Sequence, residues 1–361
     1  MTWDKVLDVD TDHVFRNRTW WWWWLLFFFR NPADPLRWRQ LVLLWGTRNC
    51  RKLVVNGHEW RNDLTFRRTD QGLEVDGMTA AWYYDGRTMH DPLFVDDGHL
   101  LLSRGGDGGK LELANGGNAY AYDVSAEPNR VRVRRPDCAV DLEILPWVPH
   151  LDGLVPTGKQ YLWNLGYRMF KVRGQRARGT ITAAGRTDAV EGTVYFQNVR
   201  INSPTSPWYW SAFHSENGSY LDYFMPHMGP PAMRRTERHA SRLDWGERSL
   251  SRGLIFVDGR DGKVRRVKNL KMRKTYAGDL PTFTLTGEDA ATAVRMVMET
   301  YARAYWKIEQ PFLGILTSRL YYNEYPAILR EFEFREGTRR TTLADLGAWT
   351  VGNCEHAWGI V

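Results

Sequence analysis

A carboxylic acid set among aromatic rings is the feature of this sequence that points most directly to chemistry. Trp208, Trp210, His214 and Tyr220 stand shortly before Asp222. An acid buried among such rings loses hydration, which raises its pKa and keeps it protonated near neutral pH. A protonated acid can donate its proton to an alkene, and the faces of Trp and Tyr rings can stabilise the resulting carbocation. The alternative is that Asp222 lies on the solvent face of an amphipathic hairpin.

The turn of the predicted hairpin decides which of these side chains lie together. A two-residue turn at 217–218 places Asp222 opposite Phe213, whereas a three-residue turn at 216–218 places Asp222 opposite Ala212. We favour the three-residue turn, because Asn before a left-handed Gly suits a type I turn with a bulge. In that register all five residues of the aromatic and acidic set share one face of the sheet.

A second candidate follows near the end of the chain, where Asn353, Cys354, Glu355 and His356 are consecutive. In a strand, neighbouring side chains point to opposite faces, so these four residues cannot form one compact site. Cys354 is expected to serve packing. Glu355 is the better functional candidate, since a second acid or a hydrogen-bonding carboxylate would complement Asp222.

The elements that must position these residues are predicted to be antiparallel strands. Turn pairs such as Asn56-Gly57 and Asp76-Gly77 recur at short spacing, and runs rich in Val, Leu, Tyr, Phe and Trp lie between them. One segment differs: across 287–307, apolar residues recur with a period near 3.6 after an acidic first turn, which predicts an amphipathic helix.

The length of 361 residues predicts two domains. A single sheet of this length would leave exposed edges, so the strands are expected to close into two antiparallel β-barrels. The expected domains are 1–180 and 181–361, with the seam in the basic, Gly-rich stretch 171–185. The helix at 287–307 would belong to the second barrel.

The composition limits the classes of function. The 18 Trp, 16 Tyr and 15 Phe residues exceed what a core needs, and the net charge of +7 favours anionic partners without implying nucleic acid. Three separated cysteines suggest neither a disulfide framework nor a zinc site. Asp85, His90 and Asp91 crowd one loop, but acids before Gly or Pro usually form turns. The sequence therefore predicts no metal and no cofactor.

Two segments bear on membranes. The run 20–29 is apolar and begins with five Trp, but it is about half as long as a membrane-spanning helix. As a strand it would present rings on both faces, to a barrel interior on one side and to a second domain or a membrane interface on the other. The stretch 260–274 carries eight Lys or Arg residues and could contact anionic lipid, although a solvated charged face is the default.

Several motifs resemble the two-domain lipocalin-like proteins. This group includes the carotenoid 1,2-hydratases (hydroxyneurosporene synthases), the AttH-type proteins and, more distantly, tocopherol cyclase and fungal Diels–Alderases. The stretch VEGTVYF at 190–196, followed by PWYW at 207–210 and an aromatic strand, is similar to the signature of their second domain. The closing LGAWTVGNCEHAWG at 346–359 looks like their last strand, and the triplet at 82–84 is a weaker match to a first-domain element.

This resemblance implies two calycin-like barrels that hold a lipophilic isoprenoid or polyketide ligand in or between them. It also implies an aromatic-x-Asp acid, which corresponds to Tyr220 and Asp222 here. The family often has Asp-His where this chain has Gln197-Asn198, and a neutral amide cannot protonate an alkene.

We therefore expect an enzyme without a cofactor that hydrates or cyclises a lipophilic isoprenoid or polyene, with Asp222 as proton donor and Tyr220 and Glu355 assisting. The predicted substrate-binding residues are Trp208, Trp210, His214, Gln197, Tyr195, Trp82 and Tyr84. A non-catalytic carrier of a lipophilic ligand and a pericyclase resembling Diels–Alderases are the alternatives. The expected location is cytoplasmic, with a peripheral membrane contact as a further possibility, and no nucleic-acid partner is expected.

Overall fold

The chain folds into strands in two compact units. The computed structural model describes residues 7, 19–63, 66–105, 108–146, 157–162, 165–202, 207–228, 248–249, 253–312 and 316–360. The first unit comprises Met1–Arg30, Gln40–Tyr83 and Asp91–Pro204, and the second comprises Asn31–Arg39, Tyr84–His90 and Thr205–Val361. The main division falls after Pro204, whereas the expected seam at 180–181 lies inside a long strand.

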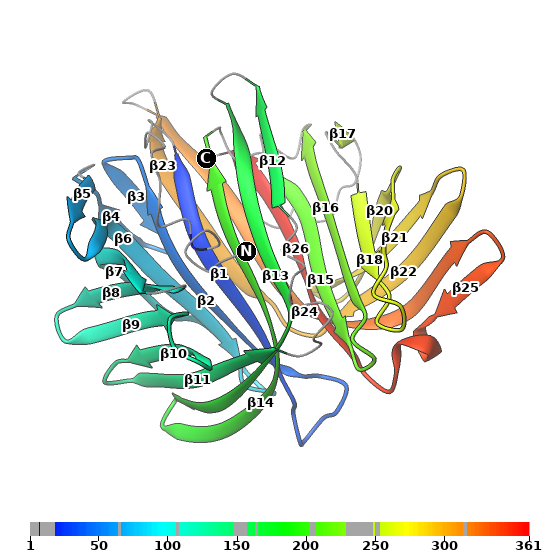
Figure 1. Ribbon diagram of the computed structural model, residues 1–361. Helices are drawn as coiled ribbons and strands as arrows, with labels where there is room; N and C mark the ends of the chain where they lie inside the picture. Colours follow the sequence, from blue (N-terminus) through cyan, green and yellow to red (C-terminus); the bar gives the residue numbers. More distant parts are fainter. Residues whose placement is uncertain are drawn as a thin grey trace. The chain divides into compact units, whose positions relative to one another are not determined.

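The first unit contains a closed antiparallel barrel of ten strands (Figure 1). The barrel strands in chain order are β1 (Trp20–Phe29), β2 (Arg39–Arg48), β6 (Gly72–Tyr84), β7 (Met89–Gly105), β8 (Gly108–Asn115), β9 (Asn118–Asp123), β10 (Asn129–Arg134), β11 (Cys138–Pro146), β13 (Leu165–Ala183) and β14 (Arg186–Ile201). The sheet runs β11-β10-β9-β8-β7-β6-β2-β1-β14-β13, and β13 pairs with β11 to close it. Closure removes the unpaired edges that a single sheet would expose.

Four shorter strands accompany this barrel. β12 (Thr157–Leu162) pairs with β13, and β5 (Phe66–Thr69) pairs with β6. β3 (Lys52–Val55) and β4 (His58–Arg61) form a hairpin.

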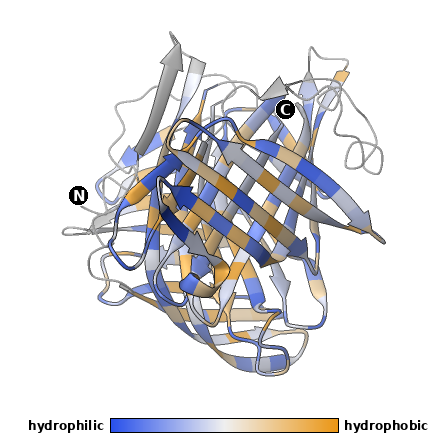
Figure 2. Ribbon diagram, turned by 90° about the vertical axis from the view of Figure 1, so that its right-hand side faces the viewer, coloured by the Kyte–Doolittle hydropathy of each residue, from blue (hydrophilic) through white to orange (hydrophobic). Residues whose placement is uncertain are grey.

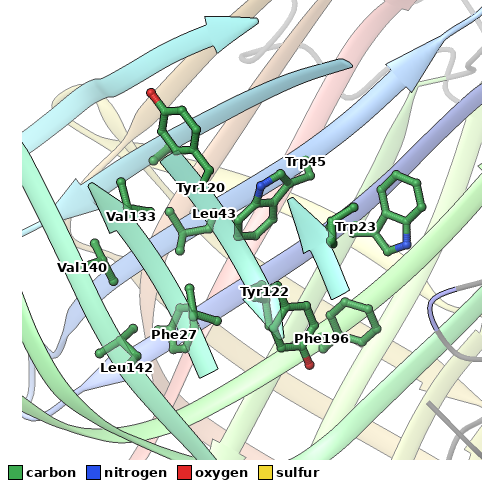
Figure 3. Packing of buried hydrophobic residues seen from close by; sticks show 14 of the residues in the cluster. Trp23, Phe27, Leu43, Trp45, Tyr120, Tyr122, Val133, Val140, Leu142 and Phe196 are labelled. Atoms are coloured by element: carbon green, nitrogen blue, oxygen red, sulfur yellow. The ribbon is translucent and has the colours of Figure 1, made fainter. Parts of the chain in front are cut away.

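Aromatic and aliphatic side chains fill the interior of the barrel. Figure 3 shows Trp23, Phe27, Trp45, Tyr122 and Phe196 packed together, and each of these side chains is buried. They come from strands far apart in the sequence, so the hydrophobic effect that buries them also fixes the strand order.

The Trp-rich strand β1 presents rings on both faces, as its sequence predicted. Trp21 and Trp23 join the barrel core, with ring centroids 4.4 Å apart. Trp20 and Trp22 point to the other face, with centroids 5.8 Å apart. Among the described residues, no helix has the length and apolar character needed to cross a membrane.

The second unit contains an open antiparallel sheet. Its main path runs β19 (Val264–Val267), β18 (Gly253–Val257), β16 (Tyr220–Met228), β15 (Trp208–Ser215), β26 (Thr350–Ile360), β24 (Leu316–Glu336), β22 (Thr292–Thr300), β21 (Leu280–Glu288) and β20 (Lys271–Ala277). β23 (Ala304–Phe312) and β25 (Arg339–Thr342) pair with β24, and β17 (Arg248–Ser249) pairs with β16. The short 3-10 helix η3 spans Leu343–Leu346.

One face of this sheet forms the core of the second unit. The core contains Tyr209, Phe213, Phe256, Phe283 and further buried side chains from the same face. Hydrophobic and hydrophilic residues alternate along many of the strands in Figure 2, which is the pattern of strands with one apolar face. The two barrels predicted from the sequence are thus one closed barrel and one open sheet.

The prediction of a helix at 287–307 is wrong, because this segment forms the end of β21, all of β22 and the start of β23. Val294, Met296 and Met298 are buried, while Arg295 between them is exposed, which is the period of a strand. Asp289 does not open a helix. Its carboxylate accepts hydrogen bonds from the backbone of Ala291 and Thr292 and so closes the turn between β21 and β22.

Cross-strand packing explains why this segment forms a strand although its apolar spacing also fits a helix. Met296 pairs with Phe332 of β24, and Met298 pairs with Phe283 of β21. These apolar pairs across two neighbouring strands outweigh a weak local preference for helix.

Candidate active site

The hairpin of β15 and β16 has the register that the sequence favoured. Asp222 pairs with Ala212 and Tyr220 pairs with His214. The turn is closed by a hydrogen bond from Gly218 N to Ser215 O of 3.0 Å, and Gly218 has a φ of +83° that favours glycine. The three-residue turn is therefore confirmed.

This register places the predicted residues of the hairpin on one face of the open sheet, opposite the core of the second unit. They are Trp208, Trp210, His214, Tyr220 and Asp222. Trp208 is half-buried, while the other four are buried. A polar sheet face that is also buried is unusual, since buried polar groups need hydrogen-bond partners.

Asp222 lies on an interior strand of the sheet. Its strand β16 pairs with β15 on one side and with β18 on the other, where Ile255 is its partner. The side chain of Asp222 is 3% exposed, and the Tyr220 hydroxyl donates a hydrogen bond of 2.9 Å to its Oδ2. Asp222 and Tyr220 thus form the acid and phenol pair that the sequence predicted.

Strand β26 adds the predicted Glu355 to the same face, and β24 adds an acid that the sequence analysis missed. Glu355 pairs with Trp210 of β15 and with Glu324 of β24. Residues directly opposite on antiparallel strands have Cβ atoms about 5 Å apart, so two carboxyl groups meet here. Glu324 is the only acid in the stretch 320–329, where every other residue except Asn323 is apolar or aromatic, and that isolation was the available signal.

The two carboxyl groups share a network of donors. The Tyr322 hydroxyl contacts Glu324 Oε1 closely and lies 2.9 Å from Glu355 Oε1. Trp208 Nε1 donates to Glu355 Oε2 at 2.6 Å, and the amide of Asn353 donates to Glu324. A phenol has one proton, so it can donate to only one of the two carboxyl groups. The other carboxyl group must carry a proton and donate it to the phenol oxygen.

Electrostatics assigns that proton to Glu324. Burial raises the pKa of Glu324 well above its usual value, and the charge of Glu355 raises it further. Burial, with the charge of Glu355, also raises the pKa of Tyr322, so the phenol stays protonated. Glu355 accepts the indole N–H of Trp208, and Glu324 accepts an amide N–H of Asn353. Glu324 is therefore the acid of this pair that holds the proton near neutral pH.

Two rings of this cluster remain partly accessible. Glu324 and Glu355 are 0% and 4% exposed, whereas Trp208 and Tyr322 are half-buried. The centroids of the two rings lie 5.4 Å apart, and their planes are inclined by 44°. Electron-rich faces beside a protonated acid can stabilise a carbocation formed next to them.

The other predicted substrate-binding residues lie elsewhere. Gln197, Tyr195 and Trp82 belong to the first unit, where Tyr195 donates a hydrogen bond of 3.0 Å to Gln197 and Trp82 is fully buried. Tyr84 belongs to the second unit and packs against Tyr301 at a centroid distance of 5.3 Å. Their role in substrate binding stays a prediction.

The loop with Asp85 and His90 forms a turn. Asp85 Oδ1 accepts hydrogen bonds from the backbone of Arg87 and Thr88, and His90 Nε2 lies 3.3 Å from Asp85 Oδ2. Within the described ranges, no three His, Cys, Asp or Glu side chains are arranged as metal ligands.

Comparisons with known proteins support the fold. No family model and no curated protein matches the sequence. The crystal structure of an AttH-like protein from Nitrosomonas europaea is similar, with a TM-score of 0.52, 12% identity, and coverage of 94% of this chain and 92% of that chain. Kievitone hydratase from Nectria haematococca aligns with a TM-score of 0.43 and 10% identity, over 95% of this chain and 89% of that chain. The predicted resemblance to AttH-type proteins is thus confirmed for the fold.

Proposed function

We propose that this protein is an enzyme that adds water, or a hydroxyl group of the substrate itself, across a double bond of a lipophilic isoprenoid or polyene. The observation that carries the proposal is the buried pair of Glu324 and Glu355 beside the half-buried rings of Trp208 and Tyr322. A carboxylic acid kept neutral at physiological pH is the group that protonation of an alkene requires.

In the proposed reaction, Glu324 gives its proton to one alkene carbon, and the π electron pair forms the new C–H bond. The adjacent carbon becomes a cation, which the faces of Trp208 and Tyr322 stabilise. An oxygen lone pair of water or of a substrate hydroxyl then forms the C–O bond. The proton released from that oxygen returns to the Glu324 carboxylate, so the acid is regenerated. Capture by water is hydration, and capture by a substrate hydroxyl is cyclisation.

Asp222 remains the rival proton donor. Three strand spacings and two residues along the strand separate it from Glu324, which is about 16 Å between Cα atoms. One acid cannot therefore replace the other at the same substrate atom. Glu324 is the stronger candidate, because burial and the neighbouring Glu355 raise its pKa.

The test begins with the substrate. Solvent extraction of the purified protein, followed by mass spectrometry, identifies any bound apolar molecule. An isoprenoid or polyene recovered in this way is then incubated with the protein in D2O. Acid-catalysed addition places one deuterium on carbon in each product molecule.

Three amide variants distinguish the mechanisms. Glu324→Gln is expected to lower turnover about 10²–10⁴-fold while substrate binding changes little, because a protonated acid and an amide have the same shape. Asp222→Asn is expected to retain most turnover. The reverse pattern would make Asp222 the acid, and turnover without deuterium incorporation in all variants would indicate a pericyclase. Binding without turnover in the wild type would indicate a carrier.

A further inference from the structure

A second cluster of titratable side chains lies on the other face of the same sheet. His356 follows Glu355 in β26 and therefore points into the core of the second unit, on the same side as Cys354 and Tyr209. His227 of β16 and Lys274 of β20 reach the same interior. Histidine and lysine are uncommon inside a core, because burial of their polar atoms costs free energy.

The cluster is compact. The rings of Tyr209 and His356 stack at 4.4 Å with an angle of 6° between their planes. His227 lies 5.0 Å from Tyr209 and 6.0 Å from His356, measured between ring centroids. Lys274 Nζ is 5.1 Å from the centre of the Tyr209 ring. The four side chains are between 0% and 7% exposed.

Both imidazoles lack hydrogen bonds within the described part of the chain. Nδ1 and Nε2 of His227, and the same two atoms of His356, have no hydrogen-bond partner among the residues that the structure describes. Nearly all buried polar atoms in folded proteins have a partner, and each exception calls for an explanation. Four ring nitrogens of this kind, two on each imidazole and close together, are typical of a site that binds a ligand.

The charge of the site selects the kind of ligand. Burial and the positive charge of Lys274 together lower the pKa of His227 to about 3. Burial, Lys274 and His227 together lower the pKa of His356 well below its usual value. Both rings are therefore neutral, and each offers one N–H donor. An ammonium group beside two N–H donors attracts an anion and repels a metal cation.

The surroundings add an apolar component. Trp358 lies 5.1 Å from His356, and Tyr321 stacks on Trp358 at 5.8 Å. Phe283 contacts Tyr209 edge to face at 6.3 Å. A ligand whose charged group reached Lys274 would have aromatic rings along the rest of its length.

We propose that His227, His356 and Lys274 bind the carboxylate of an amphipathic ligand, whose apolar part lies along Trp358 and Phe283. The carboxylate pairs with the Lys274 ammonium and accepts one N–H from each imidazole. This site is independent of the proposed acid chemistry, because Glu324 and Glu355 lie on the opposite face of the sheet.

The test uses dodecanoate and its methyl ester as matched probes, with the full-length protein and isothermal titration calorimetry. Dodecanoate is expected to bind about tenfold or more tightly than the ester, since the ester lacks the charge. On ¹⁵N-histidine-labelled protein, dodecanoate should shift the ring signals of His227 and His356. The signals of His99 should stay in place, because that side chain is 57% exposed and lies in the first unit.

Two variants complete the test. Lys274→Met is expected to weaken dodecanoate binding about tenfold or more and to leave ester binding unchanged. His356→Phe removes two buried atoms that have no partner, so it should raise the melting temperature by about 2–4 °C while it weakens dodecanoate binding. Equal affinity for acid and ester, undiminished binding in Lys274→Met, or histidine shifts produced by zinc but not by dodecanoate would each overturn the proposal.

Discussion

The pH dependence of stability in the Glu324→Gln variant tests the central assignment of the active site, that Glu324 is protonated in the folded protein at neutral pH. The amide of Gln has the shape of the protonated acid and does not titrate. It can accept the hydrogen bond from Asn353 and donate to the Tyr322 oxygen, so the variant keeps the network intact. Only the titration is removed.

The magnitude follows from the raised pKa. In the unfolded chain Glu324 ionises near its ordinary pKa of 4.5, whereas burial keeps it protonated in the folded state. The folded state then holds one more proton than the unfolded state, and its stability falls by about 1.4 kcal/mol for each pH unit above 4.5 until the folded pKa is reached. From pH 5 to pH 7, the wild type should therefore lose about 2.7 kcal/mol relative to Glu324→Gln.

Urea unfolding at pH 5, 6 and 7, followed by tryptophan fluorescence, measures this difference. Glu288→Gln is the matched control, because Glu288 is an exposed acid on β21 of the same sheet, and its curves should run parallel to those of the wild type. If the gap between wild type and Glu324→Gln stays constant from pH 5 to pH 7, Glu324 is ionised in the folded state and cannot be the proton donor.

Two further substitutions, one of them with a matched control, probe the packing and polar networks of the two units by urea unfolding. A Cβ added at Gly352 would lie 2.2 Å from the ring of Phe213, so Gly352→Ala should destabilise the protein by about 1–3 kcal/mol. A Cβ added at Gly253 would have no atom within 4 Å, so the control Gly253→Ala should change stability by less than about 0.5 kcal/mol. Asp96 accepts hydrogen bonds from four side chains, including the hydroxyl of Tyr120 at 2.5 Å, and Asp96→Ala should cost about 3 kcal/mol at pH 7. Burial alone would raise the pKa of Asp96, but the four hydrogen bonds outweigh burial and lower the pKa. The stabilisation by ionised Asp96 is therefore present above pH 3.8 and is lost as the pH falls through the folded pKa. A Gly253→Ala effect as large as that of Gly352→Ala, or a wild-type acid transition unchanged by Asp96→Ala, would contradict these two accounts.

The part of the site that could be predicted from the sequence depends on the turn and on the alternation of side chains along each strand. The hairpin of β15 and β16 could be read because an Asn-Gly turn limits the register to two choices, and the alternation of strands then fixes which side chains share a face. Glu355 was likewise placed correctly relative to His356, because neighbours in a strand always point apart.

The parts that the sequence did not predict depend on contacts between distant strands. Glu324 and Glu355 are paired by the register of β24 with β26, and no local pattern encodes that register. The strand β22 has an apolar spacing that also fits a helix. Its partners Phe283 and Phe332 decide the outcome, and they lie in other strands.

The register of β26 connects the two proposed sites. Glu355 and His356 are consecutive, so a shift of one residue would move the carboxylate into the core and the imidazole toward Glu324. Pairing with β15 on one side and with β24 on the other opposes such a shift. Gly352 adds a steric constraint on this register, because only a residue without a side chain fits beneath Phe213. A substitution at Gly352 that loosens this register should therefore impair acid chemistry and carboxylate binding together, although it touches neither Glu324 nor Lys274.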